Sequence, residues 1–150
     1  MKKLLSLILV SVVLYSCAKD GVNTVTPITG GTSPTAARSF TCTINGAAFT
    51  ADSAWYNNFN AGATNIFATK GSGSSLQYFE INLNAQTATT YNIPPNSFTY
   101  LTSTAYPATA GSLTISTYDA TNRKISGSFS NITTGAITIT NGAFANLPYK

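Results

Sequence analysis

The segment SFTCTINGAAFTADSAW, residues 39–55, decides the fold class, because a hairpin turn separates two alternating runs within it. Asn45-Gly46 suits a two-residue type I′ turn, since both central positions need a positive φ. This turn pairs apolar residues across the two strands: Ile44 with Ala47, Cys42 with Phe49, and Phe40 with Ala51. The register of the turn and the hydrophobic pattern therefore agree, and they predict strands over 39–44 and 47–55.

The same alternation predicts further strands along the chain. They fall at residues 65–70, 76–85, around 113–116, 125–130 and 136–140. Within residues 76–85 the inward face has Phe79, Ile81 and Leu83, and the outward face has Tyr78, Glu80 and Asn82. Phe144 is out of phase with Ile139 by one residue, so Asn141-Gly142 forms either a β-bulge, in which Gly142 takes the required left-handed conformation, or a second hairpin turn. Prolines exclude central strands from residues 92–110, which we expect to be loop and edge strand.

About eight strands with short connections predict an all-β fold, either an antiparallel β-sandwich or a small barrel. The chain has 150 residues, of which 43% are apolar and only 8% are charged. This length fits one domain, and the sequence lacks the periodicity of a helical bundle.

Residues 1–17 have the features of an export signal and should be left out of the fold. Lys2 and Lys3 precede an apolar run over residues 4–15, which is too short to span a bilayer. The run ends in Leu14-Tyr15-Ser16-Cys17, which resembles the lipobox of bacterial lipoproteins. The resemblance implies that residues 1–16 are cleaved and that Cys17 carries fatty-acyl chains such as palmitate.

Residues 17–38 then form the acylated cysteine and a flexible linker, because Gly, Pro and Thr dominate there without an apolar pattern. The globular domain is expected at residues 39–150. The chain carries 8 basic and 4 acidic residues, but two of the lysines lie in the signal. Without these two lysines the net charge is close to zero, so the domain lacks the basic surface that nucleic-acid binding needs.

Three segments of the domain carry a further resemblance. They are FTCTINGAAFTA at 40–51, GSLTISTYDATNRKISGSFS at 111–130 and ITITNGAFANLPY at 137–149. Together they resemble a group of small lipoproteins of the Bacteroidota that contain a β-rich domain of unknown function. This resemblance implies an outer-membrane location, facing either the periplasm or the cell surface, and no catalytic residues.

The inventory of reactive side chains argues against an enzyme and against a bound cofactor or metal. The chain has no His, which removes Ser-His and Cys-His pairs and the common zinc sites. The carboxylates of the domain, Asp52, Glu80 and Asp119, are scattered along the sequence. Cys42 alternates with apolar residues and is expected to be a small buried side chain. Asp119 and Asn122 could offer oxygens to calcium, but they fit an ordinary turn better.

Aromatic residues give the strongest functional indication. Trp55, Tyr56 and Phe59 lie among asparagines, and Tyr100 lies beside the proline-rich segment. Rings next to amides and hydroxyls resemble a sugar-stacking surface, although packing inside the core is the simpler interpretation. We expect a non-catalytic binding or adhesion module for a glycan or protein ligand. The alternative is a structural envelope component within a larger assembly.

Overall fold

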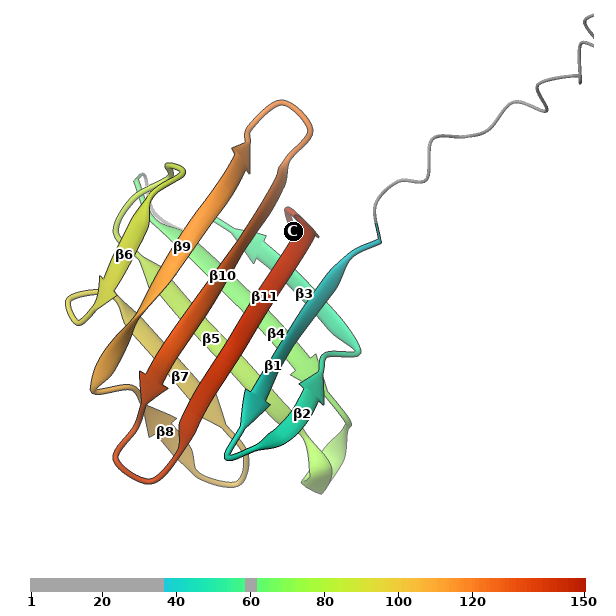
Figure 1. Cartoon of the computed structure of the whole chain (residues 1–150). Coiled ribbons are helices and arrows are strands. Elements are labelled where there is room, and N and C mark those ends of the chain that lie inside the picture. The colour runs from blue at the N-terminus through green and yellow to red at the C-terminus, as the bar shows by residue number, and fades with distance from the viewer. Residues whose placement is uncertain (1–36, 59–61) are drawn as a thin grey trace, which may run out of the picture. The chain divides into compact units, whose positions relative to one another are not determined.

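The computed structural model describes residues 37–58 and 62–150, which form two antiparallel β-sheets packed face to face (Figure 1). The six-stranded sheet has the order β2 (Ala47–Thr50), β1 (Ser39–Ile44), β11 (Thr138–Pro148), β10 (Lys124–Thr133), β9 (Ala110–Asp119) and β6 (Thr90–Ile93). The five-stranded sheet has the order β3 (Ser53–Asn57), β4 (Thr64–Lys70), β5 (Gln77–Leu83), β7 (Ser97–Leu101) and β8 (Ala105–Pro107). One short 3₁₀ turn, Gly73–Ser75, joins β4 to β5. The all-β prediction is confirmed, and the fold is a sandwich, not a closed barrel.

The first hairpin has the predicted register. Asn45 and Gly46 have φ values of 46° and 85°, as a type I′ turn requires. Ile44 pairs with Ala47, and Cys42 pairs with Phe49. The expected turn is therefore confirmed.

The expectation of one strand over residues 47–55 is wrong. β2 ends at Thr50, and the chain then crosses to the other sheet, where β3 begins. The backbone N–H of Ala51 still donates to the carbonyl of Phe40 at 3.0 Å, whereas that of Asp52 donates to Thr69 at 2.8 Å. Asp52 also accepts the N–H of Gly71 through its carboxylate at 2.8 Å. These bonds satisfy backbone groups of both sheets at the crossing, and Trp55 consequently lies in the five-stranded sheet.

A single core fills the space between the sheets. Phe40 lies near its centre, with ring centroids 5.3 Å from Phe79 of the opposite sheet and 5.4 Å from Phe129. The inward side chains predicted for β5 are confirmed, since Phe79, Ile81 and Leu83 are all buried. Offset and edge-on aromatic contacts of this kind contribute packing energy beyond the area they bury.

β11 contains the predicted bulge, and it contains a second one. Thr41 pairs with Ala143 but Thr43 pairs with Thr140, so β11 has one extra residue at this point. A similar shift opposite β10 places another extra residue near Asn146. Asn141 and Asn146 have φ values of 52° and 50°, so asparagine supplies the left-handed conformation that was expected of Gly142. The alternative of a hairpin turn at this point is wrong, because the strand continues to Pro148.

The expectation for residues 92–110 is right in part. Pro94 and Pro95 lie in the turn between β6 and β7, and Pro107 ends the edge strand β8. However, β7 is an internal strand, because it pairs with β5 on one side and with β8 on the other. The prolines flank β7 without entering it, so its ladder keeps its N–H donors.

The expected signal, Cys17 and the linker up to residue 36 lie outside the described residues. Among the residues that are described, no helix is long and apolar enough to cross a membrane.

Candidate functional site

The aromatic residues singled out in the sequence do not form one surface. Tyr56 is only 2% exposed and Tyr100 only 6%, so both rings belong to the core. Tyr56 packs edge-on against Tyr149, with ring centroids 5.4 Å apart. Phe59 lies outside the described residues. Of the four, only Trp55 is found half-exposed on an outer sheet face. For Tyr56 and Tyr100 the simpler interpretation, packing inside the core, is therefore confirmed, and these two rings offer no stacking surface on the outside.

Trp55 belongs to a row of rings on the outer face of the five-stranded sheet. It pairs with Phe67 across β3 and β4, with centroids 5.6 Å apart and an interplanar angle of 25°. Phe67 in turn stacks on Tyr78 of β5 at 6.0 Å and 29°. We call Trp55, Phe67 and Tyr78 the outer aromatic row. Its neighbours cover Phe67 so well that only 8% of this outward-facing residue is exposed.

The two ends of the outer aromatic row are chemically different. The Lys150 ammonium lies over the Trp55 ring, 4.5 Å from its centroid, which is a cation–π geometry. The backbone N–H of Lys150 donates to the carbonyl of Tyr56 at 2.9 Å and holds this residue beside β3. At the other end, burial and then the negative charge of Glu80 raise the pKa of Tyr78 to about 12. The Tyr78 hydroxyl therefore stays protonated at neutral pH, as a hydrogen-bond donor.

A polar row runs beside the aromatic one on the same face. Asn57, Asn65, Asn82 and Ser97 are successive cross-strand partners over β3, β4, β5 and β7. The side-chain amide of Asn65 donates to Asn57 at 3.3 Å, and that of Asn82 donates to Ser97 at 3.0 Å. Asn82 also contacts the Glu80 carboxylate at 3.4 Å. Amide, hydroxyl and carboxylate groups thus line one side of the outer aromatic row.

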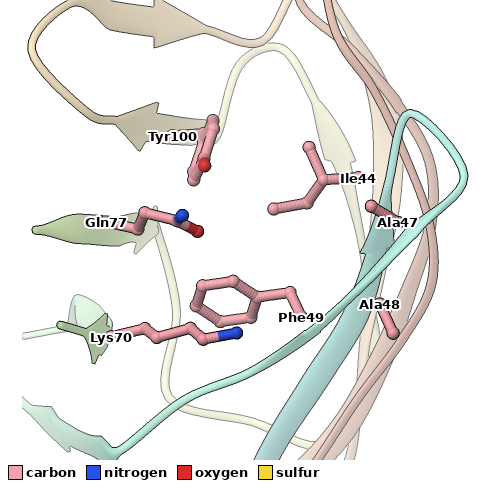
Figure 2. Close-up of a pocket in the computed structure, with 7 residues that line it drawn as sticks. All are labelled: Ile44, Ala47, Ala48, Phe49, Lys70, Gln77 and Tyr100. Atoms are coloured by element: carbon pink, nitrogen blue, oxygen red, sulfur yellow. The ribbon is translucent and has the colours of Figure 1, made fainter. Parts of the chain in front are cut away.

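A pocket of about 190 Å³ opens at one end of the sandwich (Figure 2). One wall comes from the β1–β2 hairpin and the other from the ends of β4, β5 and β7. Its lining residues are Ile44, Ala47, Ala48, Phe49, Lys70, Gln77 and Tyr100. The sequence did not predict this pocket.

The polar groups of the pocket come from inward positions of the five-stranded sheet. Lys70 and Gln77 are cross-strand partners, and Lys70 continues the inward alternation of Ile66 and Ala68. The Lys70 ammonium lies 5.4 Å from the centroid of the Phe49 ring. Burial, followed by the proximity of Cys42 and Tyr106, raises the pKa of Tyr100. Apolar and hydrogen-bonding groups therefore face one another across a small cavity.

The carboxylates of the domain lie apart and are engaged locally. Asp119 accepts the backbone N–H of Asn122 at 2.8 Å and its side-chain amide at 2.7 Å, which confirms the turn interpretation. The first of these bonds is the main reason that the pKa of Asp119 is lowered. Within residues 37–58 and 62–150, no group of three His, Cys, Asp or Glu residues could hold a metal ion.

Cys42 is a packing residue, as expected. Its side chain is 5% exposed between the sheets, and burial raises the pKa of the thiol to about 12. The thiolate, which is the reactive form, is therefore scarce at neutral pH.

Comparisons of the chain with protein-family models, with curated proteins and with solved structures give no match.

Proposed function

We propose that this chain is a membrane-anchored envelope lipoprotein whose β-sandwich is a non-catalytic binding module for a glycan or protein ligand. The observation that carries the proposal is the pairing of the outer aromatic row with the polar row on one sheet face. The ligand would lie across strands β3, β4 and β5.

The chemistry of this face suits a glycan in particular. Trp55 and Tyr78 present half-exposed ring surface, which offers apolar contact to the C–H groups of a sugar. The amides of Asn57 and Asn82 can both donate to and accept from sugar hydroxyls, and Glu80 can accept from them. Binding sites generally combine apolar surface with a small number of well-placed polar groups.

The anchor is proposed from the sequence. The positive residues, the short apolar run and the small residue before Cys17 support cleavage and acylation at this cysteine. More than one acyl chain makes membrane attachment stable, and the linker would let the domain reorient.

The alternative, a structural component that assembles through its sheet edges, has weaker support. The outermost strands β2 and β6 have four residues each, and β8 has three and ends in proline. Short edge strands and edge prolines hinder pairing with another chain. The β3 edge is partly occupied, since Lys150 bonds to Tyr56.

A glycan and protein ligand panel, titrated against the purified full chain, tests the binding role. The variants Trp55→Ala and Tyr78→Ala should weaken binding of any captured ligand by about tenfold or more, as truncated interface aromatics do. Tyr118→Ala is the matched control, because Tyr118 is a half-buried tyrosine of β9 in the other sheet. Flat titrations of the wild type, or equal affinity in all variants, would overturn the proposed surface.

Anchoring is tested separately by labelling growing cells with radioactive palmitate. Label should enter the wild-type chain and be lost in Cys17→Ser. Protease treatment of intact and lysed cells then distinguishes the cell surface from the periplasm. Label that persists in Cys17→Ser would contradict acylation at this residue.

A further inference from the structure

We propose that the pocket between the β1–β2 hairpin and the ends of β4, β5 and β7 binds a small monocarboxylate with an apolar body. Lys70, Gln77 and Tyr100 would hold the carboxylate, and Phe49 and Ile44 would contact the apolar part. This site is distinct from the outer face of the proposed function, and it does not depend on that proposal.

Tyr100 gives the first argument. Although the residue is only 6% exposed, its hydroxyl has no hydrogen-bond partner in the described part of the chain, and Figure 2 shows it at the pocket. No side-chain nitrogen or oxygen of the described residues is both buried and without a partner, so the Tyr100 hydroxyl must be open to the pocket that it lines. Tyr91, which is equally buried, differs, because its hydroxyl donates to the carbonyl of Thr87 at 2.7 Å. Tyr100 therefore offers an unused donor to whatever enters the pocket.

Lys70 gives the second argument. It occupies an inward position of β4, where the two preceding inward residues, Ile66 and Ala68, are fully buried. No ion pair joins Lys70 to a carboxylate among the described residues, and nearby Asp52 accepts from the Gly71 backbone. No acidic side chain lines the pocket. A cation at a partly buried site favours an anionic ligand, since the pair is less screened there than on the open surface.

The size and the apolar wall define the rest of the ligand. A dry cavity of about 150 Å³ lined by apolar residues is known to take up benzene. The volume of about 190 Å³ found here therefore fits one small ring, or a chain of similar size, together with a carboxylate. Phe49, Ile44 and Ala47 supply the apolar contact opposite the three donors (Figure 2).

Calorimetric titration of the full chain with benzoate and hexanoate tests the site. Saturable binding is expected for the carboxylates, with much weaker binding of the neutral benzamide. Lys70→Met, which keeps the length of the side chain, should lower the affinity at least tenfold, because it removes a charge-assisted hydrogen bond. Tyr100→Phe should lower it severalfold while retaining the ring contact with Phe79, whose centroid lies 4.8 Å away. Lys124→Met is the control for loss of a lysine outside the pocket.

Circular dichroism must show that each variant is folded before its affinity is compared. Equal affinity for benzamide and benzoate would overturn recognition of an anion. Unchanged affinity in Lys70→Met, or no saturable binding to folded wild-type chain, would overturn the site itself. Trp55→Ala should bind benzoate normally, so failure at the outer face and failure at the pocket are separable.

Discussion

The Phe129 ring packs against Gly142 so closely that a Cβ atom at residue 142 would fall 2.1 Å from it. Gly142 has no left-handed φ, so its role is to leave room for this ring. We expect Gly142→Ala to lower the free energy of unfolding by about 1–3 kcal/mol through overpacking. Urea denaturation measures this change. The control is Ala143→Ser at the exposed neighbouring position, and an equal unfolding midpoint in both variants would contradict the packing argument.

Because the thiol of Cys42 is buried, the free energy of unfolding should depend on pH in the alkaline range. Its pKa rises from 9.0 to about 12 on folding, so above pH 9 the unfolded chain loses a proton that the folded chain keeps. The free energy of unfolding should therefore fall as the pH rises through this window.

Denaturation of the wild type and of Cys42→Ala between pH 8 and pH 10, a range chosen around the unfolded pKa, measures this contribution. The fall should be shallower in the variant, because the tyrosines that also titrate have higher ordinary pKa values. If the free energy of unfolding falls equally steeply with pH in the wild type and in Cys42→Ala, Cys42 does not contribute to the pH dependence.

At the scale of elements, the bulge in β11 depends on a residue that tolerates positive φ. Asn141 is exposed and has a φ of 52°, a conformation that β-branched side chains resist. Asn141→Gly should keep the stability within a few tenths of a kcal/mol, whereas Asn141→Val should cost about 1–2 kcal/mol. Thr138→Val, at an exposed position in the same strand, is the control. Equal thermal midpoints for Asn141→Val and Thr138→Val would contradict this account.

Elements that depend on neighbours in the sequence were predictable, and those that depend on distant partners were not. The Asn45-Gly46 turn and the phase shift before Phe144 follow from local alternation and turn chemistry. The crossing at Asp52 depends on a bond to Thr69 in another strand, and the internal position of β7 depends on pairing with β5. Neither partner can be identified from the alternation of one segment alone.

At the scale of the whole molecule, β11 lies between β1 and β10 and supplies three buried side chains to the core. We expect removal of residues 138–150 to abolish cooperative unfolding, because the six-stranded sheet would lose an internal strand. Removal of Lys150 alone should preserve the fold while changing the fluorescence of Trp55, the only tryptophan of the chain. Near-ultraviolet circular dichroism and tryptophan emission measure both effects. A cooperative transition after removal of the whole strand would contradict the prediction.

In the candidate sites, too, the features that depend on distant partners could not be predicted from the sequence. Trp55 was found from its asparagine-rich surroundings, and Tyr78 was correctly expected on the outward face of its strand. Their relation through Phe67 depends on the order β3-β4-β5, which only the assembled sheet provides. The pocket was still harder to predict from the sequence, because it depends on the packing of the two sheets, which brings Phe49 of one sheet close to Lys70 of the other.

The pairing of β1 with β11 also has a consequence for the order in which the sheet can form during synthesis. Ribosomes make the first strand long before the last, yet the N–H of Asn45 bonds to the carbonyl of Thr138, 93 positions later. Until β11 has been synthesised, the edge of β1 that it covers has no partner, and the sheet cannot close. The six-stranded sheet can therefore be completed only after residues 138–148 have been synthesised.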